Sequence, residues 1–147
     1  MTHAFFDNPT FREYARLLFE LHLLIAQEQD EGEDGERLRD QMDVLSRRLS
    51  QPEIEALSEL SEDFYSISDP PNHWVPTTED CAWKGDAQIL RSQRRFLEAF
   101  GLLRKFAPSI DSAELALQRG RLWEQLNEPR IARAFYDHAR KLVPTKP

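Results

Sequence analysis

The chain has 147 residues, of which 26 are Asp or Glu and 19 are Lys or Arg, so its formal net charge is −7. This length is typical of one domain, which buries about 68–70% of its unfolded surface, and the apolar fraction of 40% excludes a wholly disordered chain. The single cysteine excludes an internal disulfide, and no signal peptide or membrane-spanning run is recognisable, so we expect a cytoplasmic protein without a membrane partner.

A broad apolar pattern over residues 10–28 predicts the first long helix. Its N-cap is either Thr10, in a capping box, or Asn8, which precedes Pro9 at the first helical position. Apolar residues cover most of its circumference, which is typical of a helix buried among others, so we expect it to be the central packing helix. On this helix, His22 is expected to be a hydrogen-bonded residue of the core or of its boundary.

Two further helices are predicted before the prolines near residue 70. An acidic connection over residues 27–36 precedes them, and we interpret it as a solvated loop, because Gly32 at a calcium-ligand position has no ligand side chain. The helix over residues 34–49 has apolar residues along one face. Ser50 and Glu53 then form a capping box for the third helix.

Residues 70–85 form a connection without helical periodicity, because three prolines interrupt it. It carries Trp74 and Trp83, which a plain linker would not need. These side chains either pack over the first three helices as a strap, which we favour, or anchor a partner in a binding loop. His73 and Cys81 are the only near pair of metal-ligand types, whereas a zinc site needs three or four converging ligands.

The pattern over residues 86–106 predicts one long helix, which ends before Pro108. Arg91, Arg94 and Arg95 cluster on one side of it, and a basic stripe of this kind can bind phosphates. The acidic balance of the whole chain favours a solvated face instead. A nucleic-acid or anion binder therefore stays an alternative function.

Two helical patterns within residues 113–146 are separated by a very short turn at residues 127–129. Small residues stand where the two helices would approach closely, and aromatic residues flank them: Gly120, Trp123, Ala132, Phe135, Tyr136 and Ala139, followed by Pro144. The pattern resembles the tetratricopeptide repeat, a helix pair of about 34 residues. The resemblance implies that Gly120 faces the second helix around Ala132 or Tyr136.

The pair departs from the family pattern at Ala116, where the family prefers Trp, and at Arg119, where it prefers Leu. In the family the first helix of each pair lines an inner groove, which implies a partner-binding face made by Glu114, Leu117, Arg121 and Glu124. These residues lack the Lys/Asn cluster with which some members bind a C-terminal carboxylate. One clear unit is fewer than the roughly three repeats of a free-standing array, so the preceding helix, the Trp-containing connection or a second copy of the chain must complete any groove. Residues 38–69 resemble stretches of uncharacterised bacterial proteins, a likeness that implies no function.

No pattern typical of catalysis is recognisable in the sequence. The four histidines are dispersed, and Cys81 stands beside Asp80, whose carboxylate would raise the pKa of the thiol. No Gly-rich phosphate loop, nucleophile turn or His-Glu-x-x-His pattern occurs. We therefore expect no enzyme and no cofactor, and a metal-dependent enzyme that uses His73 is the remaining alternative.

Together these patterns predict a single all-α domain of about six helices. An acidic three-helix bundle (residues 1–69) and the connection (residues 70–85) precede a short tetratricopeptide-like array (residues 86–147). Residues 1–73 hold 6 Lys or Arg against 17 Asp or Glu, and the remainder holds 13 against 9. The opposite charges suit either two faces that attract each other or a bipolar surface that steers a charged partner. The predicted function is a non-catalytic adaptor or regulatory module that binds a peptide or partner protein, or a second copy of itself.

Overall fold

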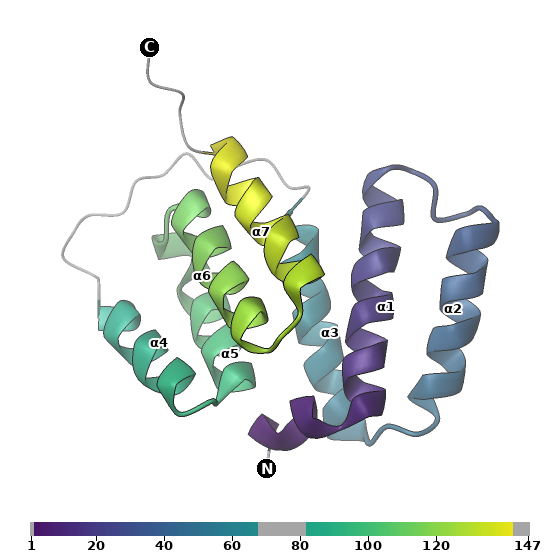
Figure 1. The fold of residues 1–147 in the computed structure, drawn as a ribbon, viewed down its shortest axis with the longest axis horizontal. Helices are drawn as coiled ribbons and strands as arrows, with labels where there is room; N and C mark the ends of the chain where they lie inside the picture. The colour runs from purple at the N-terminus through teal and green to yellow at the C-terminus, as the bar shows by residue number, and fades with distance from the viewer. Residues whose placement is uncertain (1, 68–81, 143–147) are drawn as a thin grey trace. The chain divides into compact units, whose positions relative to one another are not determined.

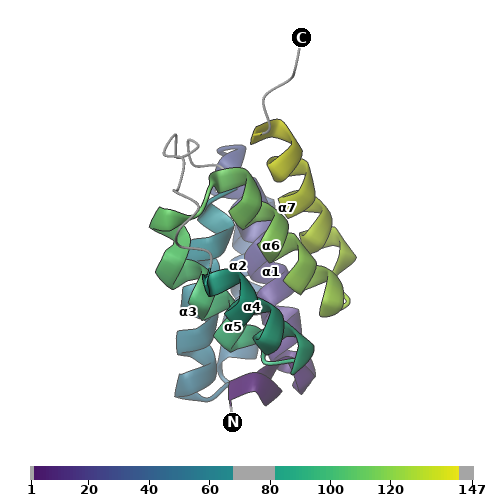
Figure 2. The same cartoon turned by 90° about the vertical axis from the view of Figure 1, so that its left-hand side faces the viewer.

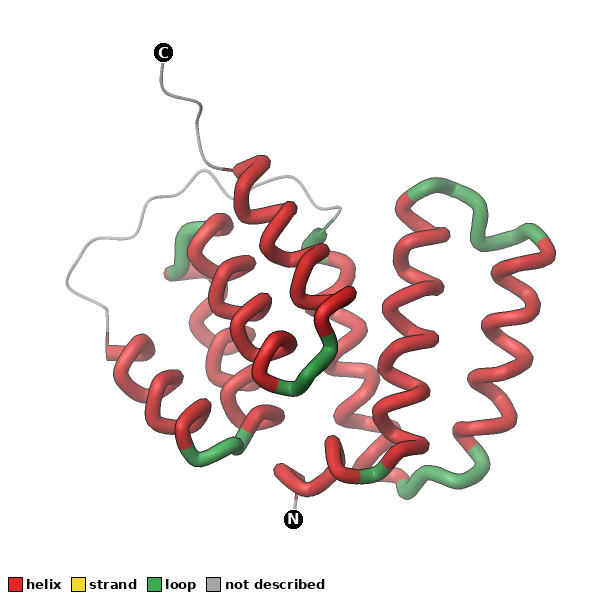
Figure 3. The backbone as a smooth tube through the Cα atoms, in the orientation of Figure 1, coloured by secondary structure: helices red, strands yellow, loops and turns green. Residues whose placement is uncertain are grey.

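The structure, a computed structural model, describes residues 2–67 and 82–142, and 83% of these residues are helical, with no β-strand among them. The predicted all-α class is therefore confirmed, although the described ranges hold seven α-helices rather than about six. Two 3-10 helices complete the set (Figures 1 and 3). The chain divides into two compact units, Met1–Ser68 and Asp69–Pro147.

In the first unit, α1 (Pro9–Ala26) lies between α2 (Glu33–Ser46) and α3 (Gln51–Tyr65) (Figure 1). The 3-10 helix η1 (Thr2–Asp7) packs against α1 and α3. Because α1 contacts every other element of this unit, the prediction that it is the central helix is confirmed. Its buried residues are Phe11, Ala15, Leu18, Phe19, Leu21 and His22.

Hydrogen bonds at the N-termini determine where α1 and α3 begin. Asn8 is the N-cap of α1, because its side-chain oxygen accepts from the Thr10 backbone N–H at 3.0 Å. The predicted capping box of Ser50 and Glu53 is present at the start of α3. Asn8 Nδ2 also donates to Glu53 Oε2 at 2.9 Å, which ties the starts of these two helices together.

Aromatic and leucine side chains of α1 and α3 form the core of the first unit. Phe19 and Phe64 pack edge to face, with ring centroids 5.6 Å apart. Leu57 and Leu60 of α3 are also fully buried. The buried residues of α2 are few, which leaves α2 as a peripheral and largely charged helix.

The described part of the second unit contains α4 (Ala82–Ser92), α5 (Phe96–Phe106), α6 (Ser112–Gln125) and α7 (Pro129–Leu142) (Figure 2). The 3-10 helix η2 (Ala107–Ser109) stands between α5 and α6. Each helix packs against the next one along the chain, in antiparallel order, and the most extensive contact joins α6 and α7. α4 and α6 therefore run in the same direction.

The prediction of one helix over residues 86–106 is wrong, because the chain turns at Arg94 between α4 and α5. Arg94 has a left-handed backbone with φ 59°; its N–H donates to the carbonyl of Arg91 at 3.1 Å, and the N–H of Arg95 donates to that of Leu90 at 2.9 Å. This is the Schellman pattern that ends many helices, usually with glycine at the left-handed residue. Because arginine stands at this position instead of glycine, the sequence gives no signal that a helix ends at Arg94.

The predicted start of this helix is also wrong, because α4 begins at Ala82 rather than at Asp86. Trp83 therefore lies on a helix and not in an aperiodic connection. It is 4% exposed, and Ala87, one turn later on the same face, is buried too, so both belong to the core. The rest of the predicted connection lies outside the described residues, including His73, Trp74 and Cys81.

Candidate functional site

The hairpin of α6 and α7 begins at a capped N-terminus and closes at a tight turn. The Asp111 carboxylate accepts from the backbone N–H groups of Ala113 at 3.1 Å and Glu114 at 3.4 Å. Asn127 reverses the chain with φ 62°, a left-handed conformation that asparagine tolerates. Pro129 then occupies the first position of α7, where its missing N–H is harmless.

The two helices approach most closely at Gly120, where the ring of Tyr136 lies against α6. A Cβ atom on Gly120 would lie 2.7 Å from Tyr136 Cε1, which is shorter than any ordinary contact. The prediction that Gly120 faces the second helix around Tyr136 is therefore confirmed. The Tyr136 hydroxyl donates to Glu124 Oε1 at 3.1 Å, and burial together with this carboxylate raises the pKa of the phenol.

Fully buried aromatic side chains of the hairpin pack next to this contact. Trp123 packs on Phe100 of α5 with ring centroids 5.0 Å apart, and Phe135 of α7 is buried as well. Arg119, where the resembled family prefers leucine, is only 4% exposed. One side of the hairpin is thus packed against α5.

A groove of about 880 Å³ runs along the hairpin, and we call it the α6–α7 groove. Its volume falls within the range of about 300–1,000 Å³ that is typical of ligand sites. The apolar part of its lining consists mainly of alanines, Leu117 and the Tyr136 ring. The lining residues are Asp111, Ala113, Glu114, Leu117, Glu124, Asn127, Pro129, Ala132, Arg133, Tyr136, Asp137, Ala139 and Arg140.

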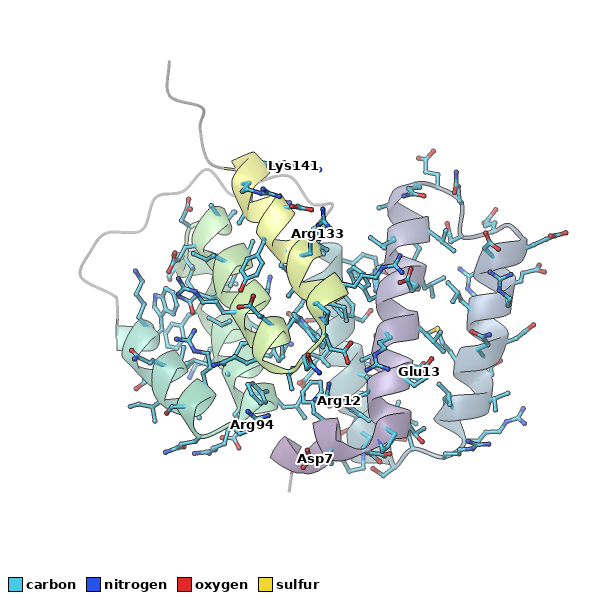
Figure 4. The ribbon with its side chains drawn as sticks, viewed as in Figure 1. Asp7, Arg12, Glu13, Arg94, Arg133 and Lys141 are labelled. Atoms are coloured by element: carbon cyan, nitrogen blue, oxygen red, sulfur yellow. The ribbon has the colours of Figure 1, made fainter. Side chains whose placement is uncertain are left out.

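Several charged side chains of the groove interact with neighbours. Asp137 pairs with Arg140 and, at 4.0 Å, with Arg133, which Figure 4 shows on α7. Glu114 is 3.8 Å from Lys84 of α4. Four carboxylates and two arginines line the groove, so its own charge is negative and favours a basic ligand.

The sequence-based site residues are only partly brought together. Arg121 is exposed on α6 and stands one turn from Glu124, so it borders the groove without lining it. Trp83 is buried, and Trp74 lies outside the described residues. That the sequence-based site residues bind a partner stays a prediction. Those that line the groove are Glu114, Leu117 and Glu124.

Sequence reasoning missed the α7 side of the groove. Arg133, Asp137 and Arg140 recur at steps of four and three, which places them on one helical face, and this spacing is a signal that the sequence does carry. The repeat-like pattern assigns only a packing role to Ala132 and Ala139. In the structure both alanines also line the groove.

The arginines of the alternative anion-binding face have different surroundings. Arg95 pairs with Glu98, and Arg94 lies over the ring of Phe96 at 5.2 Å, next to the turn that Figure 4 marks with the Arg94 label. These two side chains therefore help to close the turn between α4 and α5. The side chain of Arg91 makes no hydrogen bond or ion pair with another described residue.

His22 is a core residue of the first unit, as expected. It is 7% exposed, its Nε2 lies 2.8 Å from Ser61 Oγ, and its ring packs edge to face on Tyr65 at 4.2 Å. Burial lowers the pKa of the imidazole. Among the residues that the structure describes, no three His, Cys, Asp or Glu side chains form a group that could hold a metal ion.

Comparison of the chain with protein-family models, with curated proteins and with solved structures finds no match. Within the described ranges, none of the helices combines the length and the apolar character needed to span a bilayer.

Proposed function

We propose that the chain is a non-catalytic protein-binding module, and that its α6–α7 groove receives an amphipathic helix of a partner protein. The observation that supports this proposal is the groove, in which an apolar lining lies between charged side chains of two helices. Helix-in-groove recognition uses surfaces of this kind, and the ligand inserts apolar residues at positions i, i+3, i+4 and i+7.

The size of the lining residues favours a helix over a bulkier ligand. Ala113, Ala132 and Ala139 have short side chains, so the backbone of a ligand helix can approach the hairpin closely. α6 and α7 each have 14 residues, which corresponds to a length of roughly 21 Å. A partner segment of about four turns would follow the groove from end to end.

The charge of the groove favours basic residues beside the apolar stripe of the partner. Asp111, Glu114 and Glu124 all lie on the α6 side, whereas the α7 side carries Arg133 and Arg140 around Asp137. Complementary charges set the association rate and the specificity more than the affinity. Association should therefore slow as the salt concentration rises.

Selection of helical peptides from a display library against the purified chain tests the proposal. We expect recovered sequences with an apolar stripe of helical spacing flanked by Lys or Arg. Leu117→Arg should weaken their binding by at least about tenfold, because it places a charge in the apolar lining. Leu115→Arg is the matched control, since Leu115 is a half-buried leucine of the same helix outside the groove.

Circular dichroism of both variants verifies that the helices remain folded. The proposal is contradicted if no helical peptide is enriched, or if the enriched peptides bind Leu117→Arg as tightly as the unmodified chain.

A further inference from the structure

Two arginines of the second unit are brought together by the register of α4 and α6. These helices run in the same direction (Figures 1 and 2). Lys84 Nζ of α4 lies 3.8 Å from Glu114 Oε1 of α6. Arg91 and Arg121 each follow these residues by seven positions, which is two turns and roughly 10.5 Å along the axis. A step of seven returns a side chain to nearly the same face, so from this register we infer that Arg91 and Arg121 lie near each other.

Tyr136 of α7 lies against the part of α6 that holds Arg121. Its ring lies on Gly120, the residue before Arg121, and the hydroxyl donates to Glu124, one turn after Arg121. Burial and Glu124 raise the pKa of Tyr136, whereas the positive charges of Arg121 and Arg91 both act to lower it. The charges of both guanidinium groups therefore act on the phenol.

We propose that Arg91, Arg121 and Tyr136 form a subsite for one carboxylate side chain of the bound partner segment, an inference that rests on the proposed function. Neither arginine side chain makes a hydrogen bond or ion pair with another described residue, so the guanidinium donors are available. A guanidinium group presents its N–H donors in the planar fork that matches a carboxylate. Two like charges side by side repel each other, and a bound anion removes that repulsion.

The local charge favours a carboxylate over a phosphate. Arg91, Arg121 and Glu124 all act on Tyr136 and together carry one net positive charge, so one further negative charge makes this set neutral. A phosphate group carries about −1.5 to −2, so it would leave this set with a net negative charge. Because Arg121 lies towards the α7 end of α6, the subsite also gives the bound helix a direction, with its acidic residue near the turn of the hairpin.

Titration of the ¹⁵N-labelled full chain with small probes tests this subsite by NMR. The probes are N-acetylglutamate α-amide, which has a free side-chain carboxylate, its glutamine counterpart, and inorganic phosphate, all at one ionic strength. We expect the glutamate probe to shift the side-chain Nε–Hε signals of Arg91 and Arg121, and the glutamine probe to leave them unchanged. Arg121→Gln should weaken binding of the glutamate probe by about tenfold, which is the effect of losing one charge-assisted hydrogen bond.

Arg48→Gln, an exposed arginine of the first unit, is the matched control and should bind the probe like the unmodified chain. The subsite is refuted if no signal shifts up to about 100 mM of the glutamate probe, far above the range of a specific weak site. Equal shifts with the glutamine probe also refute it. Phosphate that binds more tightly than the glutamate probe overturns the assignment to a carboxylate.

The probes are too small to fill the α6–α7 groove, so the two proposals fail separately. Helical peptides that bind through Leu117 while the glutamate probe has no effect would leave the proposed function standing without this subsite. In the opposite outcome, Arg121→Gln weakens binding of the glutamate probe, but the helical peptides bind Leu117→Arg as tightly as the unmodified chain. This result would refute peptide binding in the α6–α7 groove and retain an arginine site for carboxylates.

Discussion

At the scale of single residues, the contact between Gly120 and Tyr136 determines how closely α6 and α7 pack. The ring of Tyr136 occupies the space in which a side chain at position 120 would lie. The ring is also fixed at its other end by the hydrogen bond to Glu124. A larger residue at position 120 must therefore displace the ring and break that hydrogen bond.

Gly120→Ala should lower the free energy of unfolding by about 1–3 kcal/mol, the usual cost of overpacking. Gly101→Ala is the matched control: Gly101 is also helical, but a Cβ atom there meets nothing within 4 Å. Because alanine is the better helix former, the control should raise the free energy of unfolding by about 0.5–1 kcal/mol. Denaturant melts of both variants provide the measurement, and a Gly120→Ala variant as stable as the unmodified chain would disprove the close contact.

His22 should make the stability of the chain dependent on pH. Burial lowers the pKa of His22 in the folded state below the ordinary histidine value of 6.5, so below that pH the unfolded state binds more protons. The free energy of unfolding should therefore fall as the pH drops through 6.5 towards the lower folded-state pKa. His22→Gln should show a shallower decline in melting temperature over this interval. Parallel curves for the two proteins would exclude His22 as the cause.

At the scale of elements, three helices end in the same way without a glycine. The left-handed residues are Glu28 after α1, Arg94 after α4 and Asn127 after α6. In each case its N–H donates three residues back, and the next N–H donates five residues back, as in a Schellman motif. Asparagine accepts this backbone readily, whereas glutamate and arginine are less favourable there than glycine.

Arg94→Gly should therefore raise the free energy of unfolding, by about 1 kcal/mol. The sign of the change distinguishes the two-helix arrangement from one continuous helix, in which glycine would cost about 1 kcal/mol. Ser92→Gly, within the last turn of α4, is the control and should be destabilising. Thermal melts decide between the two, and a destabilised Arg94→Gly variant would contradict the break at Arg94.

At the scale of the whole molecule, the chain consists of two compact units of different charge. Residues 1–68 hold 6 Lys or Arg against 16 Asp or Glu, and residues 69–147 hold 13 against 10. Within the first unit, α1 packs against η1, α2 and α3. The single domain expected from the length stays a prediction.

Residues 1–68 expressed alone should be helical and unfold cooperatively. A chain this short buries only about 60% of its unfolded surface, so its melting temperature should be modest. A fragment of residues 1–46, which lacks α3 and the buried side chains of Leu57, Leu60 and Phe64, is the control and should not fold. Circular dichroism melts compare the fragments, and a non-cooperative melt of residues 1–68 would show that this unit depends on the remainder of the chain.

The sequence by itself determined the features that depend on local physics. Helical periodicity identified the all-α class, and the spacing of Ser50 and Glu53 identified a capping box that the structure contains. The apolar circumference of α1 identified the central helix. The small residue at position 120 located the contact between α6 and Tyr136. The resemblance to the repeat picked out Glu114, Leu117 and Glu124, which line the α6 side of the candidate groove.

The tertiary structure alone decided the features that depend on residues far apart in the chain. The break at Arg94 has no sequence signal, because packing of α4 against α5 imposes a left-handed conformation on a residue that does not prefer it. The α7 side of the groove appears only when α7 folds back onto α6. Arg91 and Arg121 are 30 positions apart, and the proposed subsite depends on the parallel register of two helices that are not consecutive.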